Sequence, residues 1–182
     1  MTTTTGTRTI VPHGTWVADA LHSNANFEVE HGGVSTFRGG FKPIDAKLIS
    51  GDDGVSLEGG VKVETISIDD DNIRPHLLSP DFFDAERNPD VSFRSTEITG
   101  SADDLTVRGE LAFAGVSLPV EASGRIRGPV ATPAGDKVAL SLEATIDRTD
   151  YGMNWQMDLP GGGSILGNDV KLIVELELNR EA

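Results

Sequence analysis

The chain has 182 residues and no cysteine, and its 29 acidic and 15 basic side chains give a formal net charge of −14. This length fits one domain that can bury a sizeable core. The absence of cysteine excludes disulfide scaffolds, thiolate zinc sites and cysteine nucleophiles. A strongly anionic chain repels nucleic-acid phosphates and anionic membrane surfaces, so we expect no nucleic-acid partner.

The first residues are polar and rich in threonine, and we expect residues 1–13 to form a flexible tail before a single domain at 14–180. The amino terminus lacks the apolar stretch of a secretory signal. No segment approaches the roughly 20 apolar residues that a membrane helix needs. These observations predict a protein of the cytoplasm that has no integral membrane segment.

Apolar and polar residues alternate with a period of two in several parts of the chain. In chain order these stretches are 26–31, 105–113, 116–123, 138–146 and 170–178. Turn signals rich in glycine separate them. Strands with one apolar and one polar face are typical of antiparallel sheets that are solvated on one side.

Two features break the alternation. The apolar phase shifts between Val63 and Ile66, which predicts a β-bulge that bends the strand. Residues 70–90 have no strand pattern and predict a long connection with one or two short helical turns. Within it, Ser79-Pro80-Asp81 has the composition of a helix start, with a capping side chain followed by proline and an acid.

Ala114-Gly115 predicts a tight hairpin between the strands at 105–113 and 116–126. About eight strands fill the chain, and they can close either as a sandwich or as a barrel. Several of them are longer than sandwich strands, which favours an all-β, antiparallel eight-stranded barrel with a short helical connection around residues 70–90. The bore of such a barrel holds side chains or one small ligand.

Short motifs occur in order along most of the chain, from Trp16-Val-Ala-Asp19 to Leu166-Gly-Asn-Asp-Val170. The motifs between them lie at 22–31, 34–41, 76–84, 88–93, 109–111 and 147–155. The ordered set resembles the YceI-like family over residues 14–178. This resemblance implies a lipocalin-like barrel whose long apolar cavity binds polyisoprenoids, such as isoprenoid quinones or their precursors. It also implies that a homodimer is one option, because some members form dimers.

The expected ligand site combines an apolar wall with polar residues at the mouth of the barrel. We expect the wall to consist of Phe27, Val29, Phe41, Phe82, Phe83, Phe93, Leu111, Phe113, Leu142, Trp155 and Val174. The expected polar contacts with a ligand head are His22, Ser23, His31, Arg38 and His76. Gly109 shares a face with Val107 and Leu111, and its missing side chain is expected to open room for a chain-like ligand.

Other interpretations of these residues stay open. The apolar wall also suits a barrel filled by its own side chains, and Phe82-Phe83 either caps the barrel or anchors a helical turn. Arg38 suits a solvated turn as well as a ligand anchor. His22-Ser23, with Asp19 nearby, has the composition of a hydrolase site, but adjacent residues of a strand point to opposite faces and cannot pair.

The predicted function is non-catalytic binding of a long apolar lipid, for carriage, storage or stress protection. No cofactor is expected. No metal is expected either, because the four histidines lack the close spacing of a zinc site. One alternative is a barrel hydrolase or isomerase that acts on a small apolar substrate. Another is a structural or stress-response protein whose cavity is incidental.

Overall fold

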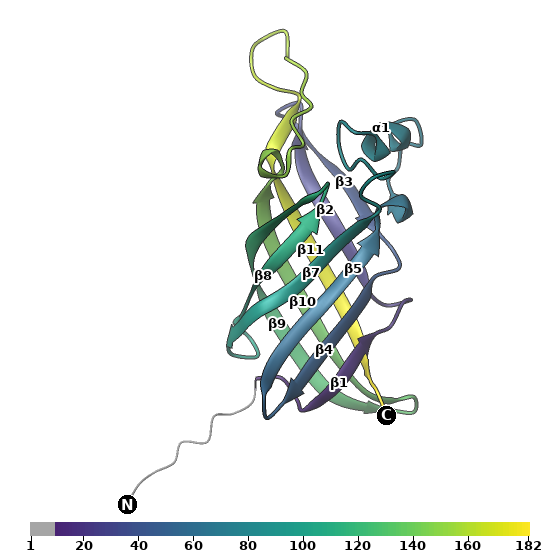
Figure 1. Cartoon of the computed structure of the whole chain (residues 1–182), viewed down its shortest axis with the longest axis vertical. Helices are drawn as coiled ribbons and strands as arrows, with labels where there is room; N and C mark the ends of the chain where they lie inside the picture. Colours follow the sequence, from purple (N-terminus) through teal and green to yellow (C-terminus); the bar gives the residue numbers. More distant parts are fainter. Residues whose placement is uncertain (1–9) are drawn as a thin grey trace, which may run out of the picture.

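One continuous antiparallel sheet closes on itself to form a barrel (Figure 1). The structure, a computed structural model, describes residues 10–182. Its strands are β1 (Gly14–Ala18), β2 (Asn24–His31), β3 (Ser35–Phe41), β4 (Asp45–Gly51), β5 (Gly54–Lys62), β6 (Ile66–Ser67), β7 (Asp90–Gly100), β8 (Leu105–Phe113), β9 (Val116–Thr132), β10 (Gly135–Asp147) and β11 (Leu166–Arg180). Three short helices join them: η1 (Val63–Thr65), α1 (Arg74–Leu78) and η2 (Arg148–Tyr151).

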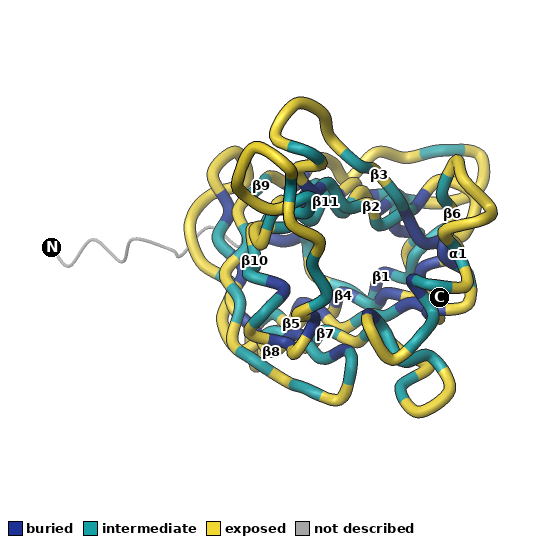
Figure 2. Tube along the Cα trace, turned by 90° about the horizontal axis from the view of Figure 1, so that it is seen from above, coloured by how far each residue is buried: buried dark blue, intermediate teal, exposed yellow. Residues whose placement is uncertain are grey.

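The predicted eight-stranded barrel is confirmed, although three of its strands are each interrupted once. β1 and β2 lie end to end, because both pair with β11. β3 and β4 follow each other in the same way, and so do β5 and β6. Each of these pairs acts as one strand of the wall, and the pairing of β1 with β11 closes the ring. Seen from above, the strands form a closed ring (Figure 2).

The third interruption lies where the sequence predicted a β-bulge, and that prediction is wrong. The single 3₁₀ turn η1 separates β5 from β6 instead. Val61, Val63 and Ile66 are all buried, at 8%, 0% and 4% exposure. A strand alone would turn the odd and even positions to opposite faces. The helical turn changes the phase, so that all three side chains reach the core.

The connection at residues 70–90 contains one short helix, but not at the predicted start. α1 ends where the helix was expected to begin: Ser79 is its C-cap and has extended backbone angles, with φ −74° and ψ 168°. Pro75 lies in the first turn of α1, where a missing backbone N–H is tolerated. Leu77 is buried on the barrel side and anchors the turn.

The predicted hairpin between β8 and β9 is confirmed. Phe113 pairs with Val116 across the two-residue turn Ala114-Gly115. Both turn residues have positive φ, 50° for Ala114 and 78° for Gly115. Such a turn matches the right-handed twist of two strands, and glycine adopts it without a steric penalty.

The two ends of the barrel differ. We call the end with the C-terminus and the β9–β10 turn the lower end, and the end with α1 and residues 148–165 the upper end (Figure 1). Large side chains fill the lower end, and we call this group the floor. Its members are at most 2% exposed: Trp16, Leu48, Leu105, Val107, Val138, Leu140 and Leu178. The bore is therefore closed at the lower end.

Part of the segment expected to be a flexible tail, residues 1–13, contacts the barrel. Val11 is 1% exposed and belongs to the core, and its carbonyl accepts a hydrogen bond from Ser50 Oγ at 3.0 Å. The Trp16 indole N–H donates to the carbonyl of Pro12 at 3.0 Å. Residues 10–13 thus pack against the lower end, while the rest of the expected tail, residues 1–9, lies outside the described residues.

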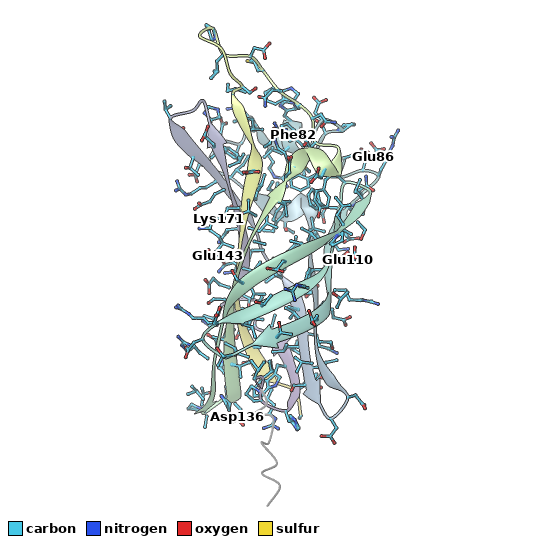
Figure 3. The ribbon with its side chains drawn as sticks, turned by 90° about the vertical axis from the view of Figure 1, so that its left-hand side faces the viewer. Phe82, Glu86, Glu110, Asp136, Glu143 and Lys171 are labelled. Atoms are coloured by element: carbon cyan, nitrogen blue, oxygen red, sulfur yellow. The ribbon has the colours of Figure 1, made fainter. Side chains whose placement is uncertain are left out.

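Charged side chains cover the outside of the wall (Figure 3). Glu110 and Glu143 point outward from β8 and β10, and Lys171 on β11 forms an ion pair with Glu143 at 3.4 Å. Their inward neighbours on the same strands are apolar, as the alternation predicted. Among residues 10–182, no helix combines the length and the apolar character that crossing a membrane requires.

Candidate functional site

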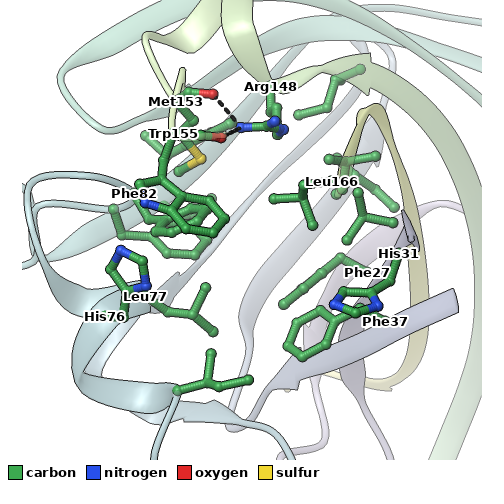
Figure 4. Close-up of a pocket in the computed structure, with 18 of the residues that line it drawn as sticks. Phe27, His31, Phe37, His76, Leu77, Phe82, Arg148, Met153, Trp155 and Leu166 are labelled. Atoms are coloured by element: carbon green, nitrogen blue, oxygen red, sulfur yellow. Dashed lines mark hydrogen bonds between the residues drawn. The ribbon is translucent and has the colours of Figure 1, made fainter. Parts of the chain in front are cut away.

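The upper half of the barrel encloses a cavity of about 310 Å³ (Figure 4). This volume lies within the range of about 300–1,000 Å³ that is usual for small-molecule sites. The wall is almost entirely carbon. It consists of Phe27, Val29, His31, Phe37, Phe41, Ile73, His76, Leu77, Phe82, Phe83, Val91, Leu111, Phe113, Ile146, Arg148, Met153, Trp155, Ile165, Leu166, Val170 and Leu172.

Five phenylalanines, each in contact with the next, form part of this wall, and we call them the aromatic belt. The ring centroids of Phe37 and Phe27 lie 6.2 Å apart, and those of Phe27 and Phe41 lie 6.0 Å apart. Phe83 continues the belt from the connection after α1, at 5.6 Å from Phe41 and 6.0 Å from Phe113 on β8. These separations are those of favourable aromatic pairs. The belt therefore holds β2, β3, β8 and the connection around one apolar space.

Three further rings cover the upper end of the cavity. His76 on α1 meets both Phe82 and Trp155 edge to face, with centroids 5.0 Å apart in each case. Phe82 and Trp155 lie 5.6 Å from each other. His76 Nε2 also lies 3.0 Å from a carboxylate oxygen of Asp81. This cluster joins α1 to the segment after η2, so both segments form a cover over the cavity.

Arg148, which is only 3% exposed, holds in place the part of the cover that follows η2. Its guanidinium donates to the carbonyls of Met153 at 2.6 Å and Trp155 at 3.0 Å (Figure 4). It also donates to the carbonyl of Gly167 at 2.9 Å. Within residues 10–182, no carboxylate lies at ion-pairing distance from it. Burial lowers the pKa of Arg148, and the charge of nearby Asp147 partly offsets this shift. The hydrogen bonds of this side chain hold the segment at 153–155 against the start of β11.

A second, smaller cavity of about 160 Å³ lies below the first. The two cavities share five wall residues, so they adjoin: Phe27, Phe41, Val91, Leu111 and Leu172. The lower cavity is lined mostly by aliphatic side chains, such as Leu142 and Val174, with Phe93 on β7. None of the floor residues lines either cavity. The two adjoining cavities therefore extend from the upper end to the middle of the barrel and stop above the floor.

All eleven apolar residues expected at the ligand site lie on the walls of these cavities. Val29, Phe82, Phe83, Phe113 and Trp155 line the upper cavity. Phe93, Leu142 and Val174 line the lower one, and Phe27, Phe41 and Leu111 line both. Their contact with a ligand stays a prediction.

The expected polar residues fall into two groups. His31 and His76 line the upper cavity, at the end where a ligand head was expected. His22, Ser23 and Arg38 line neither cavity. Arg38 points outward and pairs with Glu28 at 3.0 Å, while Ser23 is fully buried and its hydroxyl bonds to the backbone of Glu177. The geometry therefore corrects the expectation that these three residues lie at the mouth.

His22 belongs to a charged cluster near the start of β2. Its Nδ1 lies 3.2 Å from Asp19 and 3.7 Å from Glu177. The ammonium of Lys137 lies among the same groups, 2.6 Å from Glu177 and 3.7 Å from Asp19. A hydrogen bond from the backbone N–H of Leu21, helped by His22, lowers the pKa of Asp19 to about 2. Because the ammonium of Lys137 lies within 4 Å of both carboxylates, we interpret the cluster as an ion-pair network that joins the end of β1 to β10 and β11.

Gly109 does not itself provide free space, which corrects a further expectation. A Cβ built on Gly109 would lie 2.6 Å from Cζ of Phe93 and 2.3 Å from the carbonyl oxygen of Arg94. The ring of Phe93 therefore occupies the position that a side chain at residue 109 would take. The recess lets this ring lie against the wall of the lower cavity.

Arg148 was not predicted as a site residue, although it lies inside the motif at 147–155. The signal for it was a basic residue directly after an alternating strand, next to an otherwise apolar site. That signal was weak, since charged residues at strand ends usually reach solvent. Ile73, Leu77 and Met153 were missed as well, because they lie in connections where no period of two identifies an inner face.

Comparisons with known proteins place this architecture in one family. A family described as the YceI-like domain matches residues 16–178. A UPF0312 protein of Staphylococcus epidermidis is 34% identical over 168 residues, which cover 88% of this chain and 95% of that protein. Protein YceI of Escherichia coli is 31% identical over 163 residues, which cover 87% of this chain and 82% of the relative.

Solved structures share the fold. BcnA of Burkholderia cenocepacia superposes with a TM-score of 0.74 at 18% identity, over 88% of this chain and 98% of that one. A structure from Saccharophagus degradans, described as a polyisoprenoid binding domain implicated in plant cell wall breakdown, gives a TM-score of 0.68 at 10% identity. It covers 93% of this chain and 100% of its own. The family match, together with the curated relatives and the barrel geometry, shows that the chain belongs to the YceI-like family.

Proposed function

We propose that this chain binds a polyisoprenoid lipid inside the barrel and does not alter it chemically. The observation that carries the proposal is the pair of adjoining apolar cavities, of about 310 and 160 Å³, that extend from the upper end to the middle of the barrel, above the floor. An elongated apolar space that is closed at one end suits a hydrocarbon chain that enters from the other end.

The chemistry of the walls supports a hydrocarbon rather than a polar ligand. Each buried methylene group contributes roughly 0.8 kcal/mol, so a five-carbon isoprene unit contributes about 3–4 kcal/mol before the entropy of ordering is subtracted. A polar group placed among the phenylalanines would lose its hydrogen bonds with water and gain none in return. The polar end of the ligand is therefore expected at the upper end, near His31 and His76.

The fold neighbour from Saccharophagus degradans supports the class of ligand, because it is described as a polyisoprenoid binding domain. The position of Ser23 supports binding rather than hydrolysis. Its hydroxyl lies 3.2 Å from the carbonyl of Glu177 and 3.1 Å from the amide N–H of the same residue, outside both cavities. Nucleophilic catalysis would require this hydroxyl to meet both a base and the substrate.

Extraction of the purified protein with organic solvent, followed by mass spectrometry, tests the proposal. Protein expressed in bacterial cells is expected to release roughly one prenyl lipid per chain, since an eight-stranded barrel holds one small ligand. The Glu110→Gln variant, changed only on the outer face, serves as a control and should release the same amount. The proposal is wrong if no lipid is extracted and a fluorescent prenyl probe is not taken up. Turnover of a supplied lipid would contradict its non-catalytic part.

A further inference from the structure

Gly39 lies on the inner face of β3, between Phe37 and Phe41 of the aromatic belt. In the pairing of β2 with β3, Phe27 stands directly opposite this glycine. A Cβ built on Gly39 would lie 2.5 Å from Cζ and 2.8 Å from Cε1 of the Phe27 ring. The ring therefore lies flat against the backbone, in the position that a side chain at residue 39 would occupy.

The ring of Phe27 has neighbours on three sides. Gly39 lies behind it, and the rings of Phe37 and Phe41 flank it with centroids 6.2 and 6.0 Å away. Its remaining side faces the space in the barrel, because Phe27 is one of the five residues that line both cavities. The depth to which this ring recedes into the wall therefore sets how much room is left where the two cavities adjoin, and we call this region the passage.

We propose that Gly39 is a specificity-determining residue, which keeps this passage wide enough for a methyl-branched isoprenoid chain. The inference rests on the proposed function and adds to it the feature that distinguishes a branched chain from a straight one. A prenyl chain carries a methyl branch on every isoprene unit, so it needs more width than an unbranched alkyl chain of equal length. Interiors packed at crystal-like density distinguish a difference of one methyl group.

A methyl group at residue 39 should act through Phe27 and not through the backbone. The atoms nearest to the added Cβ belong to side chains: two carbons of the Phe27 ring and Cγ2 of Ile68, the latter at 2.9 Å. The backbone of Gly39 is not in the positive-φ region, so alanine fits it without strain. Gly109 differs, because a Cβ there would collide with the carbonyl oxygen of Arg94 at 2.3 Å. Gly39→Ala is therefore the cleaner change, and it should push the Phe27 ring into the passage.

The test compares two probes that carry the same fluorescent dye, one on a geranylgeranyl chain and one on a straight alkyl chain of equal length. Gly39→Ala is expected to weaken binding of the prenyl probe by roughly 10- to 200-fold, the usual effect of one methyl group in an apolar pocket. Binding of the straight probe should weaken much less. Gly51→Ala is the matched control, because nothing lies within 4 Å of the added Cβ, and it should change neither affinity.

A second pair of variants distinguishes a narrowing of the passage from a general loss of protein stability. Phe27→Leu removes the ring that a Cβ at residue 39 would displace. In this background, adding Gly39→Ala should lower the affinity for the prenyl probe by much less than 10-fold, even if Gly39→Ala alone does not fold, because only Cγ2 of Ile68 still has to move. A loss of prenyl binding of 10-fold or more from Phe27→Leu to the double variant would overturn the inference, and so would equal losses for both probes in Gly39→Ala. Wild-type protein that binds neither probe would instead overturn the proposed function, and the inference with it.

Discussion

Leu111 and Glu110 are neighbours on β8 that point to opposite sides of the barrel wall. Leu111 is 8% exposed and lines both cavities, whereas Glu110 is exposed to solvent. We predict that Leu111→Arg lowers the free energy of unfolding by several kcal/mol, because an uncompensated charge enters an apolar space. Glu110→Gln should change it by less than about 0.5 kcal/mol. Urea denaturation followed by circular dichroism measures both, and similar values for the two variants would refute this assignment of faces.

At the level of single residues, alternation identified the inner face of the regular strands. Phe27, Leu111 and Val174 could be assigned to the inside because a period of two separates the two faces of a strand. Ser23 and Arg148 could not be assigned in this way. The partners of Ser23 are backbone atoms of Glu177, 154 positions away, and those of Arg148 are carbonyls of a segment that follows no period. Contacts of this kind depend on how the strands pair in space.

Among the elements, the segment at 153–168 depends on Arg148. Arg148→Lys keeps the positive charge but loses the planar fork that reaches three carbonyls. We predict a loss of roughly 1–3 kcal/mol in the free energy of unfolding, since buried carbonyls are left without donors. Amide hydrogen exchange should also become faster at 153–168.

Arg108→Lys is the control for this prediction. Arg108 forms ion pairs on the outer surface, at 2.6 Å from Glu97 and 2.8 Å from Glu121. Exposed pairs of this kind contribute about 1 kcal/mol at most. The proposed role of Arg148 would be refuted if exchange at 153–168 were no faster in Arg148→Lys than in Arg108→Lys.

The network around Asp19 should make the junction of β1, β10 and β11 sensitive to acid. The pKa of Asp19 is about 2 in the folded protein, below its ordinary value of 3.8. The ionised carboxylate therefore stabilises the fold above about pH 4, and this contribution is lost as the pH falls from 4 towards 2. We predict that Asp19→Asn lowers the thermal unfolding midpoint at pH 7, and that the difference from wild type shrinks below pH 4 and is lost below about pH 2.

Asp53→Asn, in the exposed turn between β4 and β5, is the matched control for the acid series. Its unfolding midpoint should follow that of the wild type from pH 7 to pH 2. If Asp19→Asn followed the wild type equally closely, the ion-pair network would have no stabilising role.

The type and position of an element could be predicted where local sequence determines them. They could not be predicted where tertiary contacts determine them. The β8–β9 hairpin followed from Ala114-Gly115, since a two-residue turn needs positive φ. The phase shift before Ile66 was visible, but a bulge and a 3₁₀ turn produce the same shift in a sequence. Ser79 has the composition of an N-cap, yet burial of Leu77 on the preceding turn places the helix before it.

For the whole molecule, the number of strands and the closure of the barrel could be predicted, but the shape of its interior could not. Strand length favoured a barrel over a sandwich, and the resemblance to the YceI-like family implied an apolar cavity. The division of the bore into floor, lower cavity and upper cavity depends on where each ring lies. Phe93 in the recess of Gly109 and Phe27 in that of Gly39 are two such rings, and nothing in the sequence fixes their orientation.

The central claim is that a hydrocarbon chain occupies the two joined cavities, with its tail towards the floor. The most direct test is a crystal structure of the protein loaded with a prenyl lipid that carries a bromine atom at the tail end. The account predicts an anomalous bromine peak inside the lower cavity, among Phe93, Leu142 and Val174. Bromine on the outer surface of the barrel, or both cavities filled by side chains with no bromine peak, would contradict it.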